Sequence, residues 1–334
     1  MLEIEKDGKA VEEQKESSAF HRFRRCLQAS SSVLNRHLHH ICTALKLATA
    51  SSRLGVRTPT PPSASFPSPA EIREHGKLVQ SSPTEDRQIW SIEWQGVNMY
   101  VKEGRDVHAG EAHLTELARK KTGLPIPKVY RVEQHGDSTF IYLEALPGED
   151  AAIGFLSLTS LPLQQQRLQS ELERALQRLH RVKAPAGARV GAPTSRPLSA
   201  LFAERKVAPS LRSAAELHSY LRQLYLSHNP DRAEEYDREI SPHLDDNARL
   251  VLVHGDLHED NILVQDGRLS GIIDFGRAGW YPEWVEQWTP GLQMRSLQVV
   301  PRRLMQAMGE ATVEGQKWKW MYKAEQGWRG KIED

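Results

Sequence analysis

Cysteine is scarce in this chain of 334 residues. The sequence has 2 cysteines, Cys26 and Cys42, and both lie near the N-terminus. Two thiols at one end of a chain argue against a disulfide framework and against a cysteine-ligated metal site. We therefore expect an intracellular, reducing compartment.

Long hydrophobic runs and excess charge are also missing. No stretch approaches the roughly 18 apolar residues of a membrane span, and the N-terminus lacks the pattern of a secretory signal. Lysine and arginine together number 44, against 43 aspartate and glutamate residues, so no overall field favours nucleic acid or membrane. We predict a soluble cytoplasmic protein without a transmembrane segment or a nucleic-acid partner, present as a monomer or weak dimer.

Residues 1–70 differ in composition from the rest. An acidic start is followed by a stretch with no acidic residue between Glu16 and Glu71, and then by the Pro/Ser-rich piece RTPTPPSASFPSPA. This composition predicts a disordered or partly helical extension that ends in a linker. A basic amphipathic helix is an alternative. A mitochondrial transit segment is another, although Glu12 and Glu13 argue against it.

The most informative pattern lies between Val251 and Glu286. Three short apolar strands are expected there, at residues 251–253, at 262–264 and a third that ends at Asp274. The dipeptide Asp266-Gly267 between alternating apolar residues is a strong hairpin signal. The hairpin would bring Asn261 and Asp274 close together.

Asp256, Asn261 and Asp274 supply the oxygen groups that phosphoryl transfer needs. The reaction uses one carboxylate to orient the attacking hydroxyl, and oxygen ligands for the Mg²⁺ that neutralises the phosphates. The alternative is an ordinary turn, since Asp and Asn favour turns in any protein.

The segments HGDLHEDN and IIDFGRAG resemble the aminoglycoside phosphotransferase and choline kinase families, and most closely their fungal phosphotransferase branch. The resemblance implies an α+β, bilobal, protein-kinase-like fold, with a small β-rich N-lobe that carries one key helix and a mostly helical C-lobe. It implies that Asp256 is the catalytic base and that Asn261 and Asp274 hold metal. The substrates would be ATP with Mg²⁺ and a small-molecule acceptor.

We place the N-lobe, with the nucleotide-binding sheet and helix, at residues 71–145. The C-lobe, with the catalytic loop, metal site and acceptor region, follows at 146–334. Strands at 89–94 and 97–101, joined by a Gln95-Gly96 turn, predict an antiparallel sheet in the N-lobe.

Lys102 closes one of these strands, and Glu111 lies in the first turn of a helix expected at 110–121. In kinase-like folds a helix glutamate keeps such a lysine aimed at the phosphates. Fungal members resemble this chain in the pair Glu111-Ala112 at the helix start. Glu116 is a competing partner, and a solvated lysine is the alternative reading of Lys102.

A glycine-rich phosphate loop is missing. Neither GxGxxG nor GxxxxGK followed by Ser or Thr occurs, and Ser81-Ser82-Pro83-Thr84 stands where such a loop would be. Those residues are either a substitute or a plain turn. The segment around Glu144 and Leu146 resembles the family's hinge, whose backbone would bind adenine, although a β-turn is the alternative.

These observations predict an ATP- and Mg²⁺-dependent phosphotransferase that acts on a hydroxyl group of a small molecule. Two alternatives stay open: a nucleotide-binding pseudokinase with weak or no turnover, and a protein kinase. The identity of the acceptor does not follow from the sequence, because nothing in the acceptor region has a readable motif.

Overall fold

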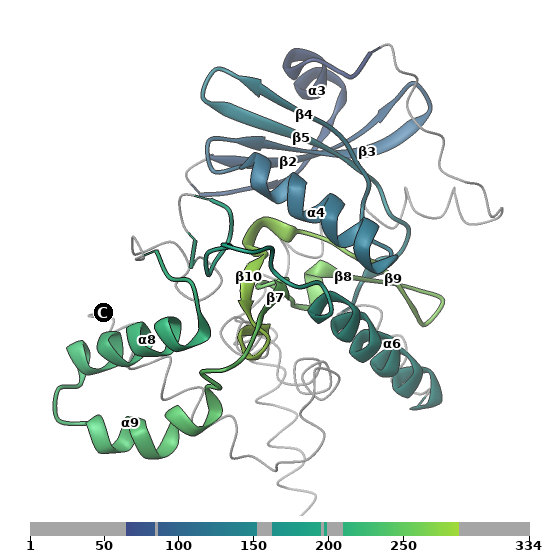
Figure 1. The fold of residues 1–334 in the computed structure, drawn as a ribbon. Helices are drawn as coiled ribbons and strands as arrows, with labels where there is room; N and C mark the ends of the chain where they lie inside the picture. The colour runs from purple at the N-terminus through teal and green to yellow at the C-terminus, as the bar shows by residue number, and fades with distance from the viewer. Residues whose placement is uncertain (1–64, 84–85, 152–161, 195–196, 199–209, 287–334) are drawn as a thin grey trace, which may run out of the picture. The chain divides into compact units, whose positions relative to one another are not determined.

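The computed structural model describes residues 65–83, 86–151, 162–194, 197–198 and 210–286, which are drawn in colour in Figure 1. All of them fall within one unit of the chain, Thr58–Asp334. Our predictions for the extension before residue 65, for Thr84 and for the tail after residue 286 lie outside the described residues.

The first part of the described chain is a five-stranded antiparallel sheet. Its spatial order is β1-β2-β3-β5-β4. The strands are β1 Lys77–Ser81, β2 Arg87–Trp94, β3 Val97–Gly104, β4 Val129–His135 and β5 Ser138–Glu144. The turn between β2 and β3 is Gln95-Gly96, with φ of 52° and 77°, as the sequence predicted.

Helix α3, Pro69–His75, precedes this sheet and differs from the predicted linker. Ser68 caps the helix and forms a capping box with Glu71, and proline occupies its first turn. Ile72 is fully buried in the cluster on this side of the sheet, and Phe66 packs against the same cluster. The last residues of the Pro/Ser-rich piece therefore pack against the sheet as part of the folded structure.

Helix α4, Ala109–Thr122, covers the opposite face of the sheet. Its Ala112 packs with Ile141 and Leu143 of β5. The helix ends at Gly123, whose φ of 63° is a common way to stop a helix. On its other side α4 contacts the later part of the chain, including a short 3₁₀ helix, η3 Phe275–Arg277.

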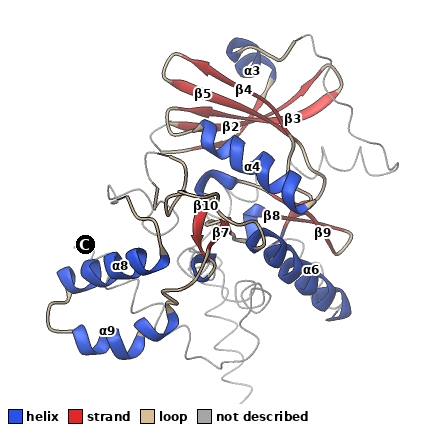
Figure 2. Ribbon diagram, viewed as in Figure 1, coloured by secondary structure: helices blue, strands red, loops and turns tan. Residues whose placement is uncertain are grey.

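The later part of the chain contains helices and two small sheets (Figure 2). The sheets have the orders β6-β8-β9 and β10-β7. The hairpin of β8 and β9 turns at Asp266-Gly267 with φ of 52° and 72°, as predicted. Besides η3, the elements are β6 Glu149–Asp150, α6 Pro162–His180, α8 Ala214–His228, α9 Ala233–Glu239, η1 Ser241–His243, β7 Leu250–Val253, η2 Glu259–Asn261, β8 Ile262–Gln265, β9 Arg268–Ile272 and β10 Gly279–Pro282.

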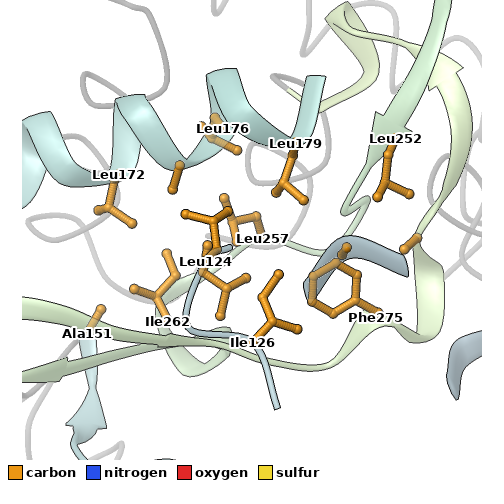
Figure 3. Packing of buried hydrophobic residues seen from close by; sticks show 14 of the residues in the cluster. Leu124, Ile126, Ala151, Leu172, Leu176, Leu179, Leu252, Leu257, Ile262 and Phe275 are labelled. Carbon is orange, nitrogen blue, oxygen red and sulfur yellow. The ribbon is translucent and has the colours of Figure 1, made fainter. Parts of the chain in front are cut away.

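A hydrophobic cluster joins α6 to these strands (Figure 3). Helix α6 buries one stripe of residues at helical spacing, including Leu172, Leu176 and Leu179. They pack in one cluster with Leu257 and Phe275, which flank the polar residues of the motif. Each buried Leu or Phe contributes about 1.5–3 kcal/mol to stability, so this cluster anchors the loop and η3 firmly.

This arrangement confirms the predicted α+β class, with a β-rich N-terminal part and helices later in the chain. Among the described residues, no helix combines the length and apolar character that crossing a membrane requires.

Candidate active site

Lys102, Glu111 and Asp274 form a charge cluster in which Lys102 and Glu111 are buried and Asp274 is partly exposed. The Nζ atom of Lys102 lies 2.5 Å from Oε1 of Glu111 and 2.7 Å from Oδ1 of Asp274. Lys102 and Glu111 expose only 5% and 9% of their surface. Glu116 is not the partner of Lys102: its Oε1 atom accepts the backbone N–H of Val129 at 3.1 Å.

Three elements deliver the charge cluster, and Asp274 lies 172 residues after Lys102 in the sequence. Lys102 lies near the end of β3, Glu111 in the first turn of α4, and Asp274 two residues after β9. A strand was expected to run up to Asp274, but β9 ends at Ile272 and Asp274 adopts φ 63° and ψ 69°. Aspartate is one of the few residues that tolerate this left-handed conformation. The reversal turns the carboxylate toward Lys102, and Oδ1 also accepts the N–H of Gly276 at 3.2 Å.

Burial and pairing compete in the charge cluster. Burial works to lower the pKa of Lys102, but Asp274 and Glu111 outweigh it and raise that pKa above its usual value. Burial works to raise the pKa of Asp274, but the Lys102 ammonium outweighs it and the pKa falls. Burial dominates for Glu111, whose pKa is raised. The cluster thus has one fixed cation between two carboxylates.

The HGD loop, residues 254–261, is held by its backbone. The carboxylate of Glu286 accepts the N–H groups of His254 at 2.7 Å and Gly255 at 3.1 Å. His254 Nε2 lies 2.9 Å from the carbonyl of Ile273 and must donate, because a carbonyl only accepts. Its Nδ1 atom is then the acceptor, and it receives the N–H of Asp256 at 3.3 Å.

Glu286 is the residue that this loop depends on. It is 1% exposed, and Nε2 of His180 lies 3.5 Å from its Oε2 atom. Burial works to raise the pKa of Glu286, but His180 and the donated N–H groups outweigh it, so the pKa is lowered. These contacts make Glu286 a structural buttress of the loop, and no spacing rule could have named the atoms it binds.

Asp256 is partly buried and faces Arg277. Its Oδ1 atom lies 3.4 Å from Nη1 of Arg277, with the two side chains 16% and 28% exposed. Both side chains keep some access to solvent. The nearness of Arg277 to Asp256 becomes visible only in three dimensions.

Asn261 is oriented by its amide nitrogen. Nδ2 donates to the carbonyl of Asp256 at 2.8 Å and contacts Nε2 of His258 at 3.0 Å. With the nitrogen engaged, Oδ1 is the atom that this side chain can offer to a ligand. The backbone also joins Asn261 to the Asp274 segment, because Ile273 donates its N–H to the Asn261 carbonyl at 3.0 Å.

Asn261 and Asp274 are the side chains that could hold a metal ion here. The described residues contain no group of three or more His, Cys, Asp or Glu placed to hold an ion. Mg²⁺ is commonly held by one or two protein oxygens together with substrate phosphates. The Asn261 amide and the Asp274 carboxylate both offer oxygen atoms, and the bond from Ile273 to Asn261 joins the two segments that carry them.

The predicted hinge residues lie at the end of β5 and just after it. Glu144 donates its backbone N–H to the carbonyl of Lys128 at 2.9 Å, and its Oε2 atom accepts the Lys128 N–H at 3.1 Å. The backbone N–H of Glu144 is therefore already used and is not available to hydrogen-bond adenine. Leu146 is half-buried beside Gly271, where an added Cβ would lie 3.1 Å from its Cδ1 atom. Adenine binding through Glu144 and Leu146 remains a prediction about their other backbone groups.

The comparison with known families gives this geometry a context. The model of the phosphotransferase enzyme family matches residues 103–289, which is more than half of the chain. The chain belongs to the phosphotransferase enzyme family. The match begins directly after Lys102 and contains Glu111, Glu144, Leu146, Asp256, Asn261 and Asp274.

Known phosphotransferases share a short segment and the fold with this family member. It is 51% identical over 37 residues to an aminoglycoside 3'-phosphotransferase of Enterococcus faecalis, and 49% identical over 37 residues to one of Staphylococcus aureus. Each match covers 11% of this chain and spans 14% of the relative's length. The crystal structure of aminoglycoside phosphotransferase APH(4)-Ia is similar over 75% of this chain and 84% of that chain, with a TM-score of 0.51 and 14% identity. That likeness shows the fold.

Proposed function

We propose that this protein is an ATP- and Mg²⁺-dependent phosphotransferase that phosphorylates a hydroxyl group of a small molecule. The observation that carries the proposal is the buried lysine of the charge cluster, which β3, α4 and the segment after β9 hold between two carboxylates. A buried cation between two carboxylates is costly to maintain for stability alone. Its position suits the binding of phosphate groups.

In this proposal Asp256 orients the acceptor hydroxyl and takes its proton as the oxygen attacks phosphorus. Its Oδ1 atom lies 3.4 Å from Nη1 of Arg277, and a carboxylate within hydrogen-bond reach of the hydroxyl is the group a general base needs. The backbone bonds from His254 and Gly255 to Glu286 fix the position of the loop. Asp256 can therefore act without moving its backbone.

Lys102 binds the phosphates of the nucleotide, and Glu111 keeps its ammonium group in place. Asn261 Oδ1 and the Asp274 carboxylate are the groups that would hold Mg²⁺. When bound, Mg²⁺ neutralises charge on the phosphates. Most of the rate enhancement then comes from positioning and electrostatics, because phosphoryl transfer demands little covalent chemistry from the protein.

Mass spectrometry of acceptor panels tests the proposal. The full chain is incubated with Mg-ATP and a panel of hydroxyl- and amine-bearing metabolites, aminoglycosides included, and each reaction is searched for a phosphate adduct with matching ADP release. We expect at least one hydroxyl acceptor to gain a phosphate. Binding of Mg-ATP in a thermal-shift titration without any adduct across the panel would favour a pseudokinase instead.

A further inference from the structure

Ser82 and Arg87 flank the connection between β1 and β2, the segment of the sequence where a glycine-rich loop is missing. The base of this connection is closed by Ser82, which donates its N–H to the carbonyl of Arg87 at 2.8 Å and accepts the Arg87 N–H at its Oγ atom at 3.1 Å. A serine hydroxyl therefore completes the bond pair that would otherwise need a second backbone group. Arg87 is also the first residue of β2.

The far side of the turn is fixed against the end of β3. The carbonyl of Asp86 accepts the N–H of Asp106 at 3.2 Å, and Arg105 forms an ion pair with the Asp86 carboxylate. Gly104 has φ of 149°, and an added Cβ there would lie 2.0 Å from the Asp86 carbonyl oxygen. These contacts place the start of β2 firmly over the end of β3.

The strand register sets the direction in which Arg87 points. Ile89 pairs with Lys102, and Arg87 pairs with Gly104. Side chains two residues apart on a strand share a face, and so do directly opposed residues of neighbouring strands. Arg87 therefore emerges on the same face of the sheet as Lys102.

The same register orders the site along β3. Met99 pairs with Glu144 at the predicted hinge, while Lys102 pairs with Ile141 farther along. Arg87, opposite Gly104, lies about 7 Å farther still, at two residues of strand rise beyond Lys102. A nucleotide whose base lies near Glu144 would reach Lys102 with its first phosphates and Arg87 with its last.

The charges around Arg87 suit this role. Lys102 is committed to two carboxylates, so it alone does not balance a triphosphate. Arg87 is exposed, and among the described residues its guanidinium forms no ion pair.

We propose that Arg87 binds the terminal phosphate of the nucleotide and so replaces part of the missing glycine-rich loop. The inference rests on the proposed function. The planar guanidinium can donate two parallel hydrogen bonds to phosphate oxygens, which suits a single anchoring residue.

Calorimetric titration with ATP, ADP and AMP tests this inference. In Arg87→Ala, the dissociation constant for ATP should rise about tenfold or more, that for ADP less, and that for AMP hardly at all. Arg131→Ala is the matched control, since Arg131 pairs with Tyr142 on the opposite face of the same sheet and forms an ion pair with Glu133. This control should bind all three nucleotides as the wild type does.

Different failures have different meanings. If the wild type binds no nucleotide, the proposed function and this inference both fail. If the wild type binds ATP and Arg87→Ala binds it equally well, or weakens ATP and AMP by the same factor, only the inference is overturned. Arg87→Lys separates charge from fork geometry and should recover part of the ATP affinity. If the melting temperatures of the Arg87 variants match that of the Arg131→Ala control, the sheet is intact in all of them.

Discussion

The charge cluster and the HGD loop solve the same problem, holding polar groups in place, in opposite ways. The charge cluster joins Lys102 to two carboxylates at 2.5 and 2.7 Å, and its lysine and Glu111 are buried. In the HGD loop the backbone is held instead, because its N–H groups donate hydrogen bonds to the carboxylate of Glu286. The carboxylate of Asp256 has a looser contact, 3.4 Å from Arg277.

The difference separates stability from chemistry. Charges that satisfy one another inside the protein become costly as soon as one is removed, because the remaining charge stays buried. When a carboxylate side chain is positioned by its backbone, it can be replaced without leaving a second charge buried and unpaired. We therefore expect substitutions in the charge cluster to unfold the protein more readily than a substitution at Asp256.

Lys102→Met should have the largest effect on stability. It leaves Glu111 and Asp274 facing each other without a cation, and the free energy of unfolding should fall by about 3–5 kcal/mol. Urea denaturation followed by circular dichroism measures this change. Lys120→Met is the matched control: Lys120 is 67% exposed in its ion pair with Glu116, and its loss should cost less than about 1 kcal/mol. Equal losses in the two variants would refute the contrast.

Glu286→Gln should have a smaller but clear effect. The amide keeps one acceptor oxygen, and its NH₂ group meets an N–H donor, so one backbone group loses its partner at a cost of about 1–3 kcal/mol. The same denaturation experiment applies, with Glu283→Gln as control because Glu283 is exposed three residues earlier. A stability unchanged from wild type would show that Glu286 does not hold the loop.

The response to pH should distinguish the two regions further. The pKa of Glu286 is lowered from 4.5 by folding, so its contribution is present above that pH and lost as the pH falls below it. Melting temperatures between about pH 6 and about pH 3 should therefore fall less steeply in Glu286→Gln than in wild type.

Lys102→Met should respond in the opposite direction. Without the ammonium, burial and mutual repulsion raise the pKa values of the two carboxylates, so protonation stabilises the folded state. The deficit of this variant relative to wild type should shrink as the pH falls. A constant deficit across the range would mean that the two carboxylates are not coupled.

Local chemistry explains which parts of this structure could be predicted from sequence. The turns at Gln95-Gly96 and Asp266-Gly267 follow from neighbouring residues that tolerate positive φ, and both are present. The capping box at Ser68 and Glu71 was an equally local signal, but the proline and serine content around it favoured a linker instead.

Long-range features could not be predicted in the same way. The bond from His254 to Glu286 spans 32 residues and has no periodic signature. The reversed backbone at Asp274 is a local departure from a strand pattern that otherwise continues. The orientation of Arg87 depends on a pairing register that becomes definite only when β2 and β3 are aligned.

The substitution Asp256→Asn tests the central claim most directly, because it should have the smallest effect on stability and a large effect on chemistry. Its melting temperature and its dissociation constant for Mg-ATP should stay close to wild type. Transfer to an acceptor found in the metabolite panel should slow by about 10²- to 10⁴-fold, the usual contribution of a general base. An Asp256→Asn protein that transfers phosphate at the wild-type rate would contradict the assignment of Asp256, and with it the proposed chemistry of the HGD loop.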